Sequence, residues 1–166
     1  MKIIRAETQE QIESVREIFR EYESWLGFSL CFQGFEQELA KLPGKYAPPL
    51  GRLWLALDEG QVVGCIALRK LEDGVSEMKR LYVHPSARGK GVGRLLIQSL
   101  IEEARRIGYE KMRLDTYPSK MGQAVEIYRA MGFVEIEPYY CNPNEGFLYM
   151  ELNLGEAGGR QQEAGS

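Results

Sequence analysis

The segment RLYVHPSARGKGVGRLL, residues 80–96, constrains this chain more than any other feature. Its glycines lie between an apolar run that alternates like a strand and one that has the spacing of a helix. Gly89, Gly91 and Gly93 therefore belong to a tight strand-to-helix turn that leaves the first N–H groups of the helix uncovered. Such a helix end attracts anions, because its free N–H groups and its dipole are both positive. The segment predicts a phosphate-binding turn.

The glycine spacing separates this turn from two other phosphate-binding loops. The Walker A pattern G-x-x-x-x-G-K-[ST] does not occur in the sequence. A dinucleotide-binding fingerprint needs G-x-G-x-x-G, and Leu96 stands where its last glycine would be. Asp115 does follow Gly93 by 22 residues, as that fingerprint requires, so a nucleotide-binding α/β protein is a third alternative. A run of three antiparallel strands before the turn argues against it.

Hydrophobic periodicity predicts a single domain over residues 1–154 and a disordered tail over 155–166. Three neighbouring strand-like runs joined by short turns form an antiparallel meander, and β-α-β crossovers follow it. This order predicts an α/β fold with one mixed sheet and helices on both faces. The expected strands are 2–6, 52–57, 62–71, 75–83, 111–116, 133–137 and 147–154, with a bulge near Gly64. The expected helices are 9–25, 35–42, 92–107 and one around 124–131.

Charge and cysteine content exclude several classes of protein. The net charge of −3 argues against a general nucleic-acid binder, and no apolar run approaches the ~18 residues of a membrane span. With charged residues near its start, the chain is expected in the cytoplasm. Three separated cysteines and one histidine indicate no zinc site or disulfide framework, and we expect free thiols that are at least partly buried. Five basic residues and no acidic one lie between Met78 and Ile101, which suits a compact polyanion.

Several motifs together resemble the GCN5-related N-acetyltransferase (GNAT) family. They are the strand SEMKRLYV, the loop HPSARGKGVG with the helix after it, and the later pattern A-x-x-x-Y-x-x-x-G-F, formed by Ala124, Tyr128, Gly132 and Phe133. The resemblance implies acetyl-CoA as cofactor and an amine as acceptor, with transfer inside a ternary complex. A small-molecule acceptor is favoured over a protein amine. A homodimer is compatible with the family's habits.

The resemblance also implies where the cofactor binds. The strand segment Leu81, Tyr82 and Val83 would pair through its backbone with the pantetheine arm, and a backbone N–H near Val83 would polarise the carbonyl. The pyrophosphate would be surrounded by Arg88, Gly89, Lys90, Gly91, Val92, Gly93 and Arg94. Met121 replaces an asparagine that the family often has, and Ser119 is the nearest polar substitute. His84 is expected to be a turn residue.

Two residues are candidates for proton transfer. A lysine-type ammonium has a pKa near 10.4, so the acceptor must lose a proton before it attacks. Glu77 lies where the family commonly has a general base, but it could equally pair with Arg80 or Lys79. Tyr128 matches the family tyrosine that protonates the leaving thiolate, although an aromatic residue at this helical spacing can also be part of a core.

The acceptor pocket is expected to be walled by the variable segments, and its candidates are Tyr22, Trp25, Phe28, Tyr139, Tyr140 and Asn142. Aromatic residues can enclose an apolar or cationic amine, and they can also be simple packing. The alternative function is a catalytically silent module that binds acyl-CoA on the same fold. The presence of both Glu77 and Tyr128 argues against it, and Met121 argues for it.

Overall fold

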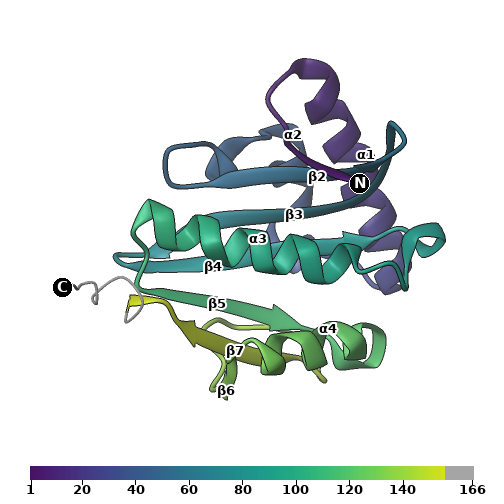
Figure 1. Ribbon diagram of the computed structural model, residues 1–166. Helices are drawn as coiled ribbons and strands as arrows, with labels where there is room; N and C mark the ends of the chain where they lie inside the picture. Colours follow the sequence, from purple (N-terminus) through teal and green to yellow (C-terminus); the bar gives the residue numbers. More distant parts are fainter. Residues whose placement is uncertain (156–166) are drawn as a thin grey trace.

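Seven strands form one mixed sheet in residues 1–155, the part of the chain that this computed structural model describes (Figure 1). The strand order is β1-β2-β3-β4-β5-β7-β6, and each neighbouring pair is antiparallel except β4 and β5. The strands are β1 Lys2–Arg5, β2 Arg52–Asp58, β3 Gln61–Glu72, β4 Val75–Val83, β5 Lys111–Thr116, β6 Val134–Ile136 and β7 Leu148–Asn153. The predicted α/β class and the order of elements are confirmed.

Helices cover both faces of the sheet, with α3 and α4 in front of it and α1 behind it in Figure 1. Helix α1 begins with a capping box between Thr8 and Gln11, and its C-cap Gly27 has a left-handed backbone. The helices are α1 Gln9–Leu26, α2 Phe35–Ala40, α3 Val92–Ile107 and α4 Pro118–Ala130, with short 3₁₀ turns η1 Cys31–Gln33, η2 Gly44–Tyr46 and η3 Pro85–Ala87. No helix within residues 1–155 is long and apolar enough to cross a membrane.

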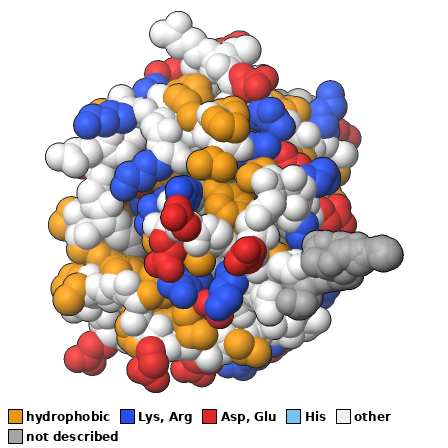
Figure 2. All heavy atoms as spheres, turned by 90° about the vertical axis from the view of Figure 1, so that its left-hand side faces the viewer, with side chains coloured by type: hydrophobic (Ala, Val, Ile, Leu, Met, Phe, Trp, Pro, Cys, Tyr) orange, Lys and Arg blue, Asp and Glu red, His pale blue; other side chains and the backbone are white. Residues whose placement is uncertain are grey.

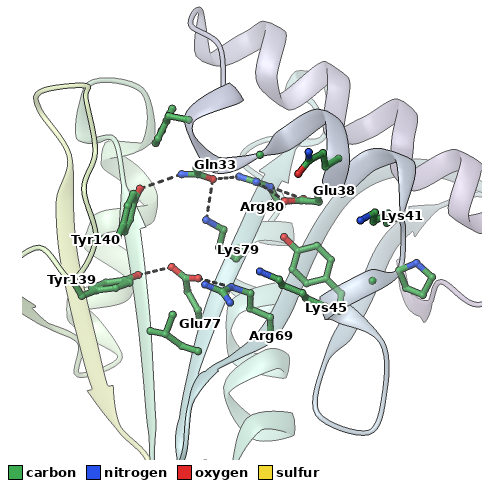
Figure 3. A pocket seen from close by; sticks show the side chains of 17 residues that line it. Gln33, Glu38, Lys41, Lys45, Arg69, Glu77, Lys79, Arg80, Tyr139 and Tyr140 are labelled. Atoms are coloured by element: carbon green, nitrogen blue, oxygen red, sulfur yellow. Dashed lines mark hydrogen bonds and ion pairs between the residues drawn. The ribbon is translucent and has the colours of Figure 1, made fainter.

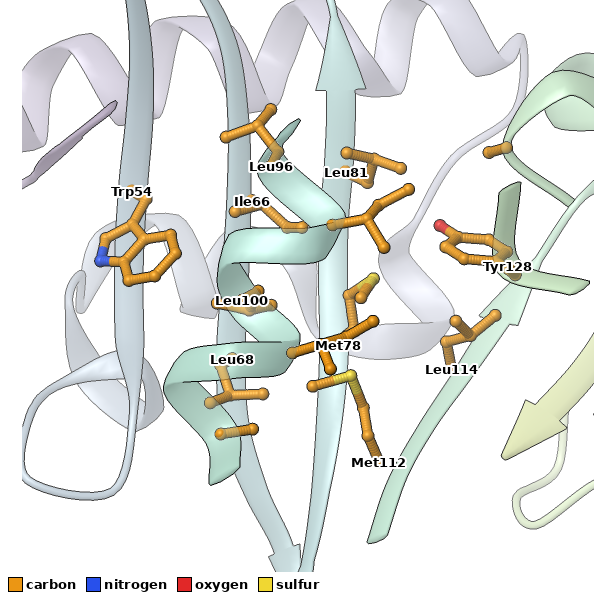
Figure 4. Close-up of a cluster of buried hydrophobic side chains, with 14 of the residues drawn as sticks. Trp54, Ile66, Leu68, Met78, Leu81, Leu96, Leu100, Met112, Leu114 and Tyr128 are labelled. Atoms are coloured by element: carbon orange, nitrogen blue, oxygen red, sulfur yellow. The ribbon is translucent and has the colours of Figure 1, made fainter. Parts of the chain in front are cut away.

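Each face of the sheet has its own hydrophobic core. On the α3 face, Leu96 and Leu100 pack on Ile66, Leu68 and Met78 of the central strands (Figure 4). On the other face the buried side chains of α1, α2 and the segment between them meet the opposite side of β2 and β3, among them Phe19, Leu30, Phe35, Leu55 and Cys65. Burying a side chain of this size stabilises the fold by about 1.5–3 kcal/mol. The two cores hold the central strands rigidly between them.

Strands β4 and β5 diverge after a short paired stretch. Their register runs only from Val75–Glu77 opposite Lys111–Arg113, so the rest of β4 has an edge without a strand beside it. The bend of β4 lies at Arg80, a buried residue with a positive φ of 62°. The pairing with β3 shifts register at this point, and the thiol of Cys65 donates to the Arg80 carbonyl at 3.1 Å. This bulge is a strained backbone position outside glycine, which is common next to functional sites.

The structure differs from the predictions in local detail. The predicted bulge beside Gly64 is present in β3, where its register with β2 shifts. Helix α4 begins at Pro118, several residues before the helix predicted around 124–131, and has a non-helical residue at Met121. Cys65 is buried, whereas Cys31 and Cys141 are exposed, which corrects the expectation for those two thiols. The predicted disordered tail lies outside the described residues from position 156 onward.

The end of the sheet with the β3–β4 turn lies opposite the glycine turn. Basic and acidic side chains mingle with apolar ones on this face (Figure 2). Ion pairs account for the mixture, for example Lys70 with Asp73 at 2.9 Å and Arg113 with Glu151 at 2.8 Å. Paired surface charges of this kind contribute little to stability and offer no field of one sign to a ligand.

Candidate active site

The largest cavity, about 950 Å³, lies between the end of β4, the glycine turn and the start of α4. We call it the glycine cleft. The N-cap of helix α3 is Gly91, which has a φ of 81° and provides no side-chain cap to the first N–H groups. A Cβ atom built on Gly89 or Gly91 would meet nothing within 4 Å, and one on Gly93 would meet only Val83 Cγ2, at 3.8 Å. The helix end is therefore open, as an anion-binding turn requires.

All but one of the predicted cofactor-binding residues line the glycine cleft. Leu81, Tyr82, Val83, Arg88, Gly89, Val92, Gly93 and Arg94 line it together with Gly91, whereas the exposed Lys90 does not. The Tyr82 hydroxyl donates to Glu21 at 2.7 Å and so does not point into the cleft. Ser119 and Met121 also line the cleft, at the start of α4.

Arg88 closes one end of this cleft. Its Nε donates to the Val83 carbonyl at 2.9 Å, and its guanidinium lies over the Trp25 ring at 4.7 Å. The Nζ of Lys120 lies over the same ring at 5.3 Å. Trp25, a predicted wall of the acceptor pocket, thus lines the glycine cleft instead. Sequence spacing did not reveal this contact, because Trp25 belongs to the last turn of α1 and is far from Arg88 in the sequence.

A small chamber of about 30 Å³ occupies the gap where β4 and β5 diverge. We call it the junction chamber. It shares Leu81 and Met121 with the glycine cleft, so the two cavities adjoin. Tyr128 lines the chamber and is 3% exposed. Burial raises the pKa of its phenol above the ordinary value, and the negative charge of Asp115 raises it further. Tyr128 therefore keeps its proton throughout the physiological range.

Thr116 and Asp115 bring polar groups into the junction chamber from β5. Among residues 1–155 the buried Thr116 hydroxyl has no hydrogen-bond partner, which is unusual for a buried polar atom. The Asp115 carboxylate accepts from the Tyr140 hydroxyl and, at 3.4 Å, from Gln33 Nε2. From the sequence, Asp115 was a candidate only as the acidic residue of a dinucleotide-binding fingerprint, and its position beside Tyr140 and Gln33 was not predicted.

A third cavity of about 440 Å³ lies on the α1 and α2 face, and Figure 3 shows it from close by. We call it the basic pocket. Its lining comes from η1, α2, η2, β3, β4 and the segment before β7. It shares Gln33, Lys79 and Arg80 with the junction chamber. The junction chamber therefore shares wall residues with both the glycine cleft and the basic pocket and lies between them.

Glu77 lies in the basic pocket and is only 2% exposed. Its Oε1 accepts from Arg69 Nε at 2.9 Å, and its Oε2 accepts from the Tyr139 hydroxyl at 2.7 Å (Figure 3). The ion pair is thus formed with Arg69 on β3 and not with Arg80 or Lys79. Glu77 does not line the junction chamber in which Tyr128 lies.

Gln33 connects several charged groups, and sequence analysis did not identify it. Its Oε1 accepts from Arg80 Nη1 at 2.7 Å and from Lys79 Nζ at 3.0 Å, while its Nε2 donates to the Tyr140 hydroxyl at 3.1 Å (Figure 3). Arg80 also donates twice to Glu38, at 2.8 and 3.0 Å. Gln33 lies within an apolar, glycine-broken stretch, where no spacing signals a site.

The remaining predicted acceptor residues are divided among different places. Tyr139 and Tyr140 line the basic pocket, and Tyr22 lines the junction chamber. Phe28 packs instead in an aromatic cluster, with ring centroids 5.2 Å from Tyr117 and 5.9 Å from Phe147. Asn142 donates to the Tyr140 hydroxyl at 3.3 Å and so supports the wall from behind.

Comparison with known proteins gives consistent results. The sequence pattern described as "Acetyltransferase (GNAT) family" matches residues 12–133. An uncharacterized N-acetyltransferase of Schizosaccharomyces pombe is 38% identical over 147 residues, which cover 87% of this chain and 90% of that protein. An acetyltransferase of the GNAT family from Staphylococcus aureus superposes with a TM-score of 0.75 at 22% identity, covering 92% and 98%. YncA from Salmonella typhimurium, solved with its cofactor acetyl-CoA, gives 0.65 at 21% identity, covering 92% and 93%.

Proposed function

The chain belongs to the GNAT family of acetyltransferases, and on that premise we propose that it moves an acetyl group from acetyl-CoA directly to a small-molecule amine in a ternary complex. The observation that carries this proposal is the arrangement of the three cavities, with a junction chamber that shares wall residues with the other two. One end has an open helix N-terminus for phosphate, and the other is a pocket of the size that small ligands occupy. Two ligands can therefore meet at the junction chamber.

The glycine cleft provides the groups that acetyl-CoA requires. The uncovered N–H groups at Gly91, Val92 and Gly93 would hold the pyrophosphate, supported by the positive helix end and by Arg94. The edge of β4 from Leu81 to Val83, which no strand covers on the β5 side, would pair with the extended pantetheine arm. The bound cofactor supplies an acetyl group activated as a thioester.

Tyr128 is the proposed general acid. Its phenol retains its proton because it is buried, and it lies in the chamber where the glycine cleft and the basic pocket meet. As the nitrogen–carbon bond forms and the carbon–sulfur bond breaks, the sulfur takes this proton while the amine gives one to a carboxylate. Positioned proton transfer of this kind contributes about 10²–10⁴-fold to a rate.

Two carboxylates compete for the role of proton acceptor. Glu77 is the residue that the family resemblance implies, and it faces the basic pocket, but Arg69 and Tyr139 already occupy both of its oxygens. Asp115 lines the same chamber as Tyr128. If Glu77 is the base, Glu77→Gln should lower turnover most at low pH, while Asp115→Asn leaves the pH profile unchanged. The reverse result would assign the role to Asp115.

Calorimetry and a thiol-release assay test the proposed function as a whole. CoA and acetyl-CoA should bind, whereas NAD and ATP should not, and free thiol should appear only when an amine is present. Binding of NAD alone would overturn the proposal. Binding of CoA with no thiol release from a broad panel of amines would favour the catalytically silent acyl-CoA module.

A further inference from the structure

Positive charge is in surplus in the basic pocket. Two carboxylates line it, and each is already paired with a guanidinium, Glu38 with Arg80 at 2.8 Å and Glu77 with Arg69 at 2.9 Å. Three further ammonium groups line the same pocket and have no carboxylate within 4 Å among residues 1–155, namely those of Lys41, Lys45 and Lys79. In a chain with a net charge of −3, this local surplus favours an anionic ligand.

Lys79 is the lysine of this set that also lines the junction chamber. Its Nζ donates to the neutral amide oxygen of Gln33 at 3.0 Å and is partly buried. An ammonium group has three N–H donors, and a partly buried charge without a hydrogen-bonded carboxylate is unfavourable, even with Asp115 near enough to act on it. A carboxylate at this point would satisfy the free donors and compensate the charge.

A negative group lies on the opposite strand. The last paired residues of the diverging strands are Glu77 and Arg113, and two positions further along are Lys79 and Asp115. Both line the junction chamber, and Gln33 joins them, accepting from Lys79 with Oε1 and donating to Asp115 with Nε2. The chamber therefore offers a positive group from β4 and a negative group from β5 to the same ligand.

We propose that the acceptor is a free α-amino acid, whose carboxylate binds Lys79 and whose amino group lies toward Asp115. In such a molecule the two charged groups are separated by a single carbon, which matches two opposite charges on either side of one narrow chamber. The exposed ammonium groups of Lys41 and Lys45, which also line the basic pocket, disfavour a cationic side chain. This inference rests on the proposed acetyl transfer and adds the substrate class to it.

Matched acceptors test the inference. Thiol release from acetyl-CoA is measured with aspartate, glutamate, leucine and phenylalanine, with the α-amide of each, and with the corresponding decarboxylated amines. At least one free amino acid should exceed its own amide and amine by about 10- to 100-fold in kcat/KM, the loss expected for one hydrogen bond to a charged group. Equal or better use of the amides would overturn the inference in favour of peptide N-termini and would leave acetyl transfer intact.

A second measurement does not depend on turnover. Calorimetry compares the N-acetyl derivatives of the same amino acids with their N-acetyl amides, in the presence of CoA. The carboxylates should bind about 10-fold or more tightly, Lys79→Gln should abolish the difference, and Lys79→Arg should retain most of it. The control is Lys70→Gln, since Lys70 pairs with Asp73 on the surface and lines none of the three cavities. A preference that survives Lys79→Gln would overturn the assignment.

Discussion

The glycine cleft and the basic pocket are built in opposite ways. The glycine cleft owes its form to backbone, with Gly89 and Gly91 in left-handed conformations and a helix end without a cap. The residues of this turn, from Arg88 to Arg94, are consecutive in the sequence, although Trp25 and the start of α4 also line the cleft. The basic pocket consists of side chains from six separate segments, joined by hydrogen bonds such as Tyr140 to Gln33, which are 107 residues apart. A site made of backbone suits a ligand common to a family, whereas a site made of side chains can change with each acceptor.

The junction between the two regions should show the largest effect. Tyr128→Phe removes the buried phenol that faces both ligands, so we expect kcat to fall by about 10²–10⁴-fold while the affinity for CoA stays unchanged. Thiol release and calorimetry measure the two quantities. Tyr109→Phe is the control, because its hydroxyl donates to the Leu50 carbonyl in the same core, away from all three cavities. Unchanged turnover in Tyr128→Phe would remove the residue from the mechanism.

Because the glycine cleft is built of backbone, Gly93→Ala should change the affinity for CoA and the stability of the fold in opposite directions. Gly93 has no positive φ, and an added Cβ meets only Val83 at an ordinary distance of 3.8 Å. Gly93→Ala should therefore raise the free energy of unfolding, by up to about 1 kcal/mol, because alanine favours the helix. The same methyl group narrows the approach to the first N–H groups, and CoA affinity should fall by about 10-fold.

Gly91→Ala provides the contrast to Gly93→Ala. Its φ of 81° is unfavourable for any residue with a Cβ, so this variant should lose about 1–2 kcal/mol of unfolding free energy in urea titrations. If Gly93→Ala and Gly91→Ala lose stability alike, conformation is not what distinguishes the two glycines. If Gly93→Ala binds CoA normally, the helix end is not the phosphate site.

The side-chain character of the basic pocket predicts a pH dependence. Burial lowers the pKa of Lys79 below its ordinary value, against the opposing effect of Asp115 and the weaker ones of Glu77 and Glu38. Arg80 acts in the same direction as burial. Lys79 is charged only below its pKa, so binding of an N-acetyl amino acid should weaken as pH rises, by about tenfold per unit above that pKa. The decline should begin below the ordinary lysine value of 10.5.

Arginine at position 79 is the matched control, because a guanidinium keeps its charge across this range. Lys79→Arg should bind the same N-acetyl amino acid with little dependence on pH between neutrality and 10.5. An identical decline in wild type and Lys79→Arg would show that another group titrates, and Lys79 would not be the anion-binding residue.

The smallest expected effect concerns Arg88, at one end of the glycine cleft. Arg88→Lys retains the charge but loses the planar contact with Trp25 and the Nε donor to Val83. CoA affinity should weaken by about two- to fivefold in calorimetry, with Arg105→Lys on the exposed end of α3 as the control. A loss as large as that of Gly93→Ala would mean that side chains contribute as much as backbone here.

The sequence predicted the sheet and the glycine turn because both depend on local patterns. Apolar spacing within each segment determined the strands and helices, and the glycines marked their own conformations. The basic pocket could not be found this way. Strict alternation along β4 would place Met78 and Tyr82 on one face, but the bulge at Arg80 sends them into different cores. The faces on which Arg80 and Leu81 lie therefore depend on a bulge, and no residue type in this strand predicts that bulge.

The acceptor residues show the same limit. Trp25 and Phe28 are aromatic residues near the end of one helix, yet one lines the glycine cleft and the other packs against Tyr117 and Phe147. Gln33 and Asp115 became candidates only when the fold placed them beside Lys79. Their chemistry comes from neighbours that are distant in sequence.

The bend at Arg80 separates the two cavities along a single strand, with the residues on either side of it lining different ones. Lys79 faces the basic pocket, and Leu81 faces the glycine cleft. Any displacement of this short stretch by one ligand is therefore transmitted to the other. Occupancy of the two sites should be thermodynamically coupled, and the factor by which cofactor tightens the acceptor must equal the factor by which acceptor tightens the cofactor. A strained residue in mid-strand would thus act as the point through which each substrate senses the presence of its partner.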